Sequence, residues 1–508
     1  MKLAKNRLLW LLLLPLAFGL NSCVDELLTE EPTTFVAPET FYKNFAEAEI
    51  AVMGAYSTLQ DGWTFNILGA PVHWGNKGVD EINSPNWAGG GRREMHLYQL
   101  TPSLGAIEEL WRGHYRGINT ANGVVDRINA MTEDQISSDS RDVLVAEAKF
   151  VRSILYFSAV KIWENIPLIR NEVLSLENLD IPQAPTAEVY DFIVEDLKFA
   201  AEVLPEGQGG GRATKGAAQA LLGKVYLQMA GFPLKQSDKF ALAAEQFREV
   251  IDSRVYRLLD DYGEVFIWTN DNNDEIVFTI GFEGPGLGEG SAVGSYMGPN
   301  GSQQNGGGWG TEYINLEFAK SYDQADVRFE QNVARINVND AVPNIIGEPA
   351  WRPWKWKKPK PNNFLYDSPF DFQYLRYADV LLSYAEALNG ANGGPTQDAY
   401  DAINQVRARA RGGANPSEVL PDLAGMGQQE FLEAVMRERR WELCFEGHRR
   451  DDLIRTEMLE STLRSINEPQ WSSAGNPGDN FESHEVRYPI PQRELDLNPS
   501  LVQNPGYQ

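Results

Sequence analysis

The stretch from residue 222 to residue 247 begins Leu222-Gly223-Lys224-Val225-Tyr226 and ends Ala243-Ala244-Glu245-Gln246-Phe247. Each of these two runs places a small residue, Gly223 or Ala243, three or four positions before an aromatic residue. This pattern is typical of a tetratricopeptide repeat, in which the small residue lets two helices approach while the aromatic ring fills the groove between them. The stretch therefore predicts a helical hairpin that can stack against others of its kind.

Helical periodicity continues in both directions from this hairpin. From Ala378 onward, apolar residues recur at the third, fourth, seventh and tenth positions, which places them along one face of a helix. A second hairpin is expected over residues 376–411, with its turn at Gly393-Gly394-Pro395, and more degenerate copies over residues 146–201. The predicted helical blocks lie at about 41–60, 106–131, 141–163, 187–204, 214–230, 238–253, 375–389, 397–411 and 428–446.

Runs with the character of β-strands are few, chiefly residues 275–280 and 486–490. We therefore predict a mostly α fold, a tetratricopeptide-like helical-repeat scaffold with long irregular aromatic loops and a few short strands. After the N-terminal segment, no run approaches the length of apolar sequence that a transmembrane helix needs, so no such helix is predicted.

The composition excludes several classes of protein. The 508 residues are 43% hydrophobic, which is too apolar for an intrinsically disordered chain. The net charge of −26 arises from 71 acidic and 45 basic side chains, and so acidic a surface would repel a polyphosphate. We therefore predict that the protein binds no nucleic acid. Two cysteines are too few for a disulfide scaffold.

The first 22 residues have the features of an export signal. Three basic residues precede the apolar run 8–18, which is too short to span a bilayer and has the length of a signal-peptide core. Leu20-Asn21-Ser22-Cys23 follows and resembles a bacterial lipobox, in which the cysteine is lipidated and becomes the first residue. The predicted organisation is a signal peptide over 1–22, lipidation at Cys23, an acylated flexible tether over 23–40 and a single helical domain over 41–508. The alternative is a plain secretory signal that happens to precede a cysteine.

Two insertions in the predicted domain do not follow the helical pattern. They cover about residues 61–102 and 260–370 and are rich in glycine, proline and tryptophan. Long loops in a compact domain are usually functional or disordered, and disordered segments are rarely this rich in tryptophan. We therefore predict that the insertions bind a ligand. The run Trp354-Lys355-Trp356-Lys357-Lys358 also mixes aromatic and basic residues, and both contact with acidic sugars and exposure to solvent or to a partner remain open for it.

Several motifs occur in the order typical of one family. They are Glu147-Ala148-Lys149-Phe150-Val151-Arg152, Asn165-Ile166-Pro167-Leu168, Arg212-Ala213-Thr214-Lys215-Gly216-Ala217-Ala218, Asn273-Asp274-Glu275-Ile276-Val277-Phe278, Leu375-Arg376-Tyr377-Ala378-Asp379, Phe445-Glu446-Gly447-His448-Arg449, Tyr488-Pro489-Ile490-Pro491 and Gln503-Asn504-Pro505-Gly506-Tyr507. With these motifs the chain closely resembles the SusD/RagB family of outer-membrane nutrient-binding lipoproteins.

The resemblance implies a helical protein that binds oligosaccharides at the cell surface and sits on a TonB-dependent transporter of the SusC type. Val24-Asp25-Glu26, just after the lipobox, looks like the signal that some Bacteroidetes lipoproteins use to reach the outer face of the outer membrane. We therefore expect a glycan-binding lipoprotein that captures oligosaccharides and delivers them to the transporter. The sequence does not identify the glycan, and it leaves a peptide or glycopeptide ligand open.

The ligand is expected on an aromatic shelf in the two insertions, since an indole face can cover the C–H face of a sugar ring. The predicted shelf consists of Trp74, Trp87, Tyr296 and Trp309, and the predicted hydrogen-bonding residues are Asn76, Asp80 and Asn86. The family's ligand site draws on loops in these two regions, so the match is by region rather than by motif.

Two other function classes remain as alternatives. A surface-tethered glycoside hydrolase needs two carboxylates that face each other across a sugar, and Asp80 and Glu81 are the acidic candidates in the first insertion. Because these residues are adjacent, they would point apart on an extended chain. A tetratricopeptide-type adaptor that binds peptides would have no evident use for the long aromatic loops.

No residue pattern indicates catalysis, a bound metal or a cofactor. Glu438, Glu442, Glu446 and His448 have the spacing of a metal or acid–base site, but arginines interleave with them and favour structural ion pairs within the helix. The glycine-rich run that ends at Thr214 is interpreted as a helix–helix turn in which Thr214 is the N-cap. Cys444 is predicted to be a core residue.

Overall fold

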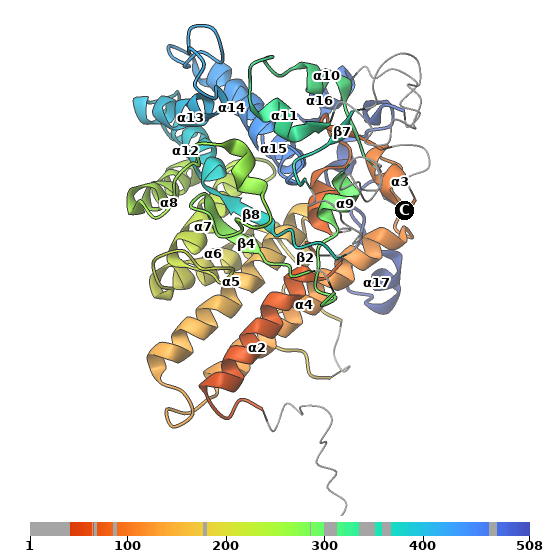
Figure 1. The fold of residues 1–508 in the computed structure, drawn as a ribbon. Helices are drawn as coiled ribbons and strands as arrows, with labels where there is room; N and C mark the ends of the chain where they lie inside the picture. The colour runs from red at the N-terminus through yellow and green to blue at the C-terminus, as the bar shows by residue number, and fades with distance from the viewer. Residues whose placement is uncertain are drawn as a thin grey trace, which may run out of the picture.

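The computed structural model describes residues 41–62, 64–65, 69–84, 89–175, 180–284, 286–298, 312–334, 351–357, 367–466 and 475–507 (Figure 1). The longer helices are α2 (Phe45–Ser57), α4 (Gly105–Asn129), α5 (Ser138–Trp163), α6 (Thr186–Val203), α7 (Lys215–Ala230), α8 (Lys239–Ser253), α12 (Tyr377–Asn392), α13 (Gln397–Ala410) and α14 (Gln428–Glu442). Shorter helices are α3 (Arg92–His96), α9 (Val293–Met297), α10 (Leu316–Lys320), α11 (Arg328–Asn332), α15 (Arg449–Arg455), α16 (Leu459–Ser465) and α17 (Gln492–Leu497). Each predicted helical block contains one of the longer helices, so the mostly α prediction is confirmed.

Side-chain caps set several of the helix starts. The Thr214 hydroxyl accepts a hydrogen bond from the backbone N–H of Ala217 at the start of α7, as predicted from the sequence. Thr396 caps α13 in the same way. Such a cap satisfies a backbone N–H that has no partner inside the helix.

The α7–α8 hairpin has the packing that its small and large residues predict. A Cβ atom added to Gly223 would lie 2.7 Å from the ring of Phe247, so the absence of a side chain on α7 makes room for the aromatic ring of α8. The same relation recurs between neighbouring pairs, because a Cβ on Gly390 of α12 would lie 2.6 Å from the ring of Phe240 on α8. The helical-repeat prediction is therefore confirmed at the level of individual contacts.

The helices stack in chain order. Contacts join α4 to α5, α5 to α6, α6 to α7 and α7 to α8, and α12 then packs against α8, α13 and α14. In Figure 1 this stack runs from α4 and α5 in the lower part to α12, α13 and α14 at the upper left. The shorter elements α3, α9, α10, α11 and β7 lie to the right of α12, α13 and α14. None of the described helices combines the length and the apolar character that crossing a bilayer requires.

The described strands are short and pair two by two. They are β1 (Ile82–Asn83) with β5 (Tyr313–Ile314), β2 (Ile166–Pro167) with β3 (Gln183–Ala184), β4 (Ile276–Ile280) with β8 (Phe372–Arg376), and β6 (Val333–Ala334) with β7 (Arg352–Pro353). The prediction of a strand at 275–280 is confirmed by β4. Its partner β8 occupies the residues just before α12, and the sequence did not separate this strand from the helix.

The strand predicted at 486–490 is wrong. Tyr488 and Ile490 are buried and Val486 is half-buried, and the hydrogen bonds of this irregular segment go to a helix end and to side chains. The backbone N–H of Tyr488 donates to the carbonyl of Ile162 at the end of α5, and that of Ile490 donates to the Gln503 side chain. The Asn504 amide then donates to the carbonyls of Trp163 and Tyr488. The C-terminal segment is therefore fastened to the end of α5.

The buried apolar side chains form two clusters. The larger one lies between helices α2 to α8 and α12, and the smaller one lies among the short elements of the second insertion and the end of α14. Trp111, Trp163 and Trp441 are buried, in keeping with their places in helical blocks. Cys444 is fully buried in the smaller cluster, so its prediction as a core residue is confirmed.

Candidate functional site

A two-residue β-ladder brings the two predicted ligand-binding insertions together. Ile82 of β1 lies opposite Ile314 of β5, and Asn83 lies opposite Tyr313. The backbone N–H of Asn315 extends this contact by donating to the carbonyl of Glu81. Segments more than 200 positions apart in the sequence therefore lie side by side, and their junction is the candidate functional site.

The first insertion is held on the scaffold by a close backbone contact. The Asn76 side chain donates to the carbonyl of Phe445 (2.8 Å) and accepts from the backbone N–H of Gly447 (3.1 Å). A Cβ on Gly75 would lie only 2.2 Å from the carbonyl oxygen of Gly447, so the two segments are in direct backbone contact. Gly447 has φ +87°, a conformation that L side chains rarely adopt. The predicted ligand residue Asn76 thus has two structural partners.

Trp74 lies inside the molecule and is 3% exposed. Its indole N–H donates to Asp451 (2.6 Å), the ring of Tyr488 meets it edge-on at 5.0 Å, and the Arg450 guanidinium lies 4.4 Å from its centroid. These neighbours cover the indole ring, so Trp74 has no face against which a sugar could stack in this structure.

Asp80 and Glu81 have carboxyl groups with very different proton affinities. Although burial alone would raise it, the guanidinium groups of Arg440 and Arg449 lower the pKa of Asp80 to about 2. Burial raises the pKa of Glu81 to about 7, even though one carboxylate oxygen accepts from the backbone N–H of Phe445. Two carboxyl groups with separated pKa values are a pattern of glycosidase active sites. Here, however, the residues are 7% and 1% exposed and their partners belong to the scaffold, so packing explains the separation.

The second insertion contributes Tyr296 of α9, which is fully buried. Two cations lie near its ring, with Lys77 Nζ 5.9 Å and Arg92 Cζ 5.4 Å from the centroid. Neither cation was predicted from the sequence, although Arg92-Arg93 directly after Gly89-Gly90-Gly91 was a signal for Arg92. The remaining predicted residues Asn86, Trp87 and Trp309 lie outside the described residues, so the shelf as a whole stays a prediction.

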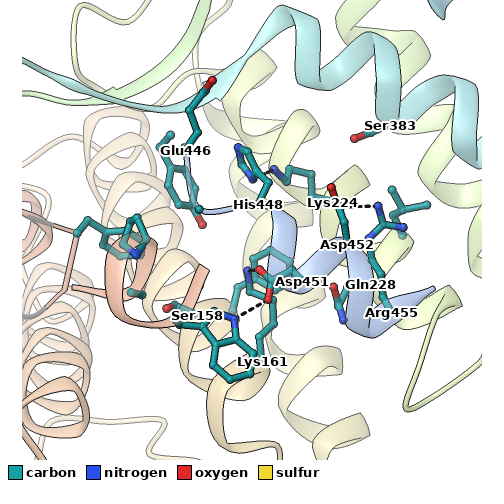
Figure 2. A pocket seen from close by; sticks show the side chains of 18 of the residues that line it. Ser158, Lys161, Lys224, Gln228, Ser383, Glu446, His448, Asp451, Asp452 and Arg455 are labelled. Atoms are coloured by element: carbon teal, nitrogen blue, oxygen red, sulfur yellow. Dashed lines mark hydrogen bonds and ion pairs between the residues drawn. The ribbon is translucent and has the colours of Figure 1, made fainter. Parts of the chain in front are cut away.

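The cavity in Figure 2 lies in the scaffold beside Trp74 and has a volume of about 70 Å³. Aromatic side chains line one part of it, and Lys161, Lys224, His448 and Asp451 line another, with Lys161 and Asp451 joined in an ion pair. Ligand pockets measure roughly 300–1,000 Å³, so we exclude this cavity as the oligosaccharide site.

The carboxylates with the spacing of a metal or acid–base site, Glu438, Glu442 and Glu446, form a buried charge network. Glu438 pairs with Arg328 and Arg407, Glu442 with Arg376 and Arg409, and Glu446 with Arg376 and Lys355, over distances of 2.6–3.2 Å. The prediction of structural ion pairs is confirmed. The expectation that these pairs lie within one helix is wrong, because the carboxylates at intervals of four point to one face and meet cations from other elements.

The described part of the basic run, residues 354–357, is not a solvated strip. The Lys355 ammonium is fully buried, where it pairs with Glu446 (2.7 Å) and donates to the carbonyls of Glu442 and Cys444. The Trp356 ring is also buried, and its indole N–H donates to Gln373. These two consecutive residues therefore anchor the second insertion to the scaffold. Within the described ranges, no group of three histidine, cysteine or acidic side chains is placed to hold a metal ion.

Known proteins resemble the chain over most of its length. A model of the SusD family matches residues 357–507, and a model described as "starch-binding associating with outer membrane" matches residues 85–227. SusD-like protein P25 of Formosa agariphila is 28% identical over 97% of this chain and 98% of its own. A solved SusD homologue from Bacteroides thetaiotaomicron is 28% identical, with a TM-score of 0.80 over 92% of this chain and 98% of that one. A laminarin-binding SusD-like protein is 26% identical, with a TM-score of 0.75 over 92% of this chain and 100% of that one.

Proposed function

The chain belongs to the SusD family, and from this premise we propose that it is a cell-surface lipoprotein that captures oligosaccharides and delivers them to a TonB-dependent transporter. The observation that carries the proposal is the joining of the two aromatic insertions by β1 and β5 on a SusD-like scaffold. The likeness to a laminarin-binding protein supports a carbohydrate as the ligand. The family model for outer-membrane association supports the location.

The ligand surface is proposed to lie at the joined insertions, with Trp87 and Trp309 as its stacking residues. The other predicted site residues that the structure describes then support this surface without facing the ligand, because each of them is buried: Trp74, Asn76, Asp80 and Tyr296. Asn76 and Asp80 fix the first insertion to the residues after α14, which is the support that a ligand-facing loop needs.

We predict that Trp87→Ala weakens polysaccharide binding about tenfold, since the loss of one stacking aromatic residue commonly costs about 1.4 kcal/mol or more. Isothermal titration against a panel of polysaccharides would measure the change. Trp268→Ala is a matched control, because Trp268 is exposed and is not a shelf residue. Equal affinity of Trp87→Ala and wild type would place the site elsewhere.

The same panel separates the proposed function from the alternatives. Binding without release of shorter sugars is expected. Sugar release that is lost in Glu81→Gln would instead establish a glycoside hydrolase. Displacement of the bound polysaccharide by peptides would favour the adaptor.

Anchoring at Cys23 is proposed to hold the protein on the outer membrane. We predict that Cys23→Ala leaves the membrane fraction, because several acyl chains are needed for firm anchoring and each buried methylene contributes about 0.8 kcal/mol. Fractionation of cells that express either form would measure this.

In a mild detergent extract, the wild-type protein is expected together with a TonB-dependent transporter. Recovery of Cys23→Ala in the membrane at the wild-type level would contradict the anchor, and recovery of wild type only as a free monomer would contradict the partner.

A further inference from the structure

Positive charge gathers around Tyr296 at the candidate site. Lys77 and Arg92 lie on this ring, and Arg93 follows in the same short helix, α3. In Figure 1, α3 and α9 lie on the side of the molecule where the short elements gather. This arrangement is unexpected in a chain whose net charge is −26.

The charge around Tyr296 is only partly neutralised. Lys77 forms an ion pair with Glu312 (2.5 Å), whereas Arg92 and Arg93 form no ion pair with any described residue. Residues 84–93 contain both arginines and no acidic residue. Glu94 is next in sequence, but it forms no ion pair with Arg92 or Arg93. Lys77 therefore has a carboxylate partner, whereas the two guanidinium groups have none among the described residues.

The two arginines are also incompletely hydrogen-bonded. Both are half-buried, and within the described part of the chain neither Nε atom has a hydrogen-bond partner. Burying part of a charged group without a partner costs free energy, which a bound anion would recover. The scaffold arginines Arg376 and Arg449, by contrast, each hold a carboxylate at 2.8 Å.

The surroundings of His96 are consistent with a positive electrostatic potential in this region. It is 1% exposed, and its ring nitrogens make no hydrogen bond to a described residue. Burial and, to a lesser extent, the nearby Lys77 ammonium lower the pKa of His96 to about 3. The imidazole is therefore neutral at pH 7 and leaves the positive charge of the region to Lys77, Arg92 and Arg93.

We propose that Arg92 and Arg93 form an anion subsite that recognises the carboxylate or sulfate groups of an acidic polysaccharide. This inference rests on the proposed glycan-binding function and names its substrate class. A guanidinium group suits this role, because its planar set of N–H donors matches the two oxygens of a carboxylate or sulfate. Lys77 lies too deep to touch the ligand and adds attraction at longer range.

The test compares each acidic oligosaccharide with its neutral counterpart. An oligouronate would be titrated beside its carboxyl-reduced form, and a sulfated oligogalactan beside its desulfated form. The wild-type protein is expected to bind one acidic probe at least tenfold more tightly than its neutral counterpart, and the probe that binds identifies carboxylate or sulfate as the anion. The combined variant Arg92→Gln/Arg93→Gln is expected to lose this preference and most of the salt dependence.

Two controls separate recognition from damage to the fold. Arg112→Gln removes an exposed arginine that pairs with Glu109, so it is expected to leave the preference intact. Arg92→Lys/Arg93→Lys keeps the charge but lacks the planar donor set, so it should retain the preference in weakened form. Thermal unfolding of each variant would check that the fold is intact.

Equal affinity for acidic and neutral forms, or an unchanged preference in the Arg92→Gln/Arg93→Gln variant, would overturn the anion subsite and leave glycan binding in place. Failure of the wild-type protein to bind any polysaccharide would overturn the proposed function as well.

Discussion

Replacing Arg376 with methionine is expected to lower the free energy of unfolding by about 3–5 kcal/mol, the usual cost of removing one partner from a buried ion pair. The Arg376 guanidinium donates to Glu446 (two bonds of 2.8 Å), to Glu275 (2.7 Å) and to Glu442 (3.2 Å). Without it, these buried carboxylates would face one another with fewer cations. Although burial alone would raise them, nearby cations hold the pKa values of Glu442 and Glu446 below their usual range.

Urea unfolding of the purified variant would measure this loss. Arg464→Met is the matched control, because Arg464 pairs with Glu460 on the surface and such pairs contribute about 0.3–0.5 kcal/mol. A loss below about 1 kcal/mol in the Arg376→Met variant would contradict a dry, fully coupled network.

Gly75→Ala is expected to destabilise the protein by about 1–3 kcal/mol or more, as is usual when an atom is forced into a packed interior. The new Cβ would lie 2.2 Å from the carbonyl oxygen of Gly447 and 2.5 Å from its Cα. These are backbone atoms and cannot swing aside, so the first insertion must move away from the segment after α14. The two hydrogen bonds between Asn76 and that segment would weaken at the same time.

Gly54→Ala provides the control for the effect of a methyl group alone. Gly54 lies within α2, and a Cβ there meets no atom within 4 Å. Alanine favours a helix over glycine by roughly 0.5–1 kcal/mol, so this variant should be slightly stabilised. If both variants unfolded at the same urea concentration, the close contact between Gly75 and Gly447 would be wrong.

The helical scaffold could be predicted because its information is local. The apolar spacing from Ala378, the cap at Thr214 and the pairing of Gly223 with an aromatic residue each act within one or two helices. Such patterns are visible in a single sequence. The prediction of a strand at 486–490 was wrong because alternating apolar residues indicate only that one side of a segment is buried. An irregular segment that is packed on one side can have the same sequence pattern.

The candidate site could be predicted only by region. Composition identified both insertions, but nothing in the sequence states that Ile82 pairs with Ile314 or that the indole of Trp74 meets Asp451. Those contacts depend on how distant segments close on each other, as do the partners of Glu442, which come from three other parts of the chain. Residue type alone could not separate a tryptophan that faces the ligand from one that plugs the loop.

The attachment of the C-terminal segment to α5 has a consequence for the order of assembly during synthesis. The helices from α4 to α8 contact their neighbours in sequence, so each pair can form soon after it is made. The bond from Asn504 to the carbonyl of Trp163 spans 341 positions, and Tyr488 reaches the carbonyl of Ile162 beside it. The carbonyls of Ile162 and Trp163 at the end of α5 therefore lack these two partners until residues 488 and 504 have been made. During that interval water must satisfy both carbonyls.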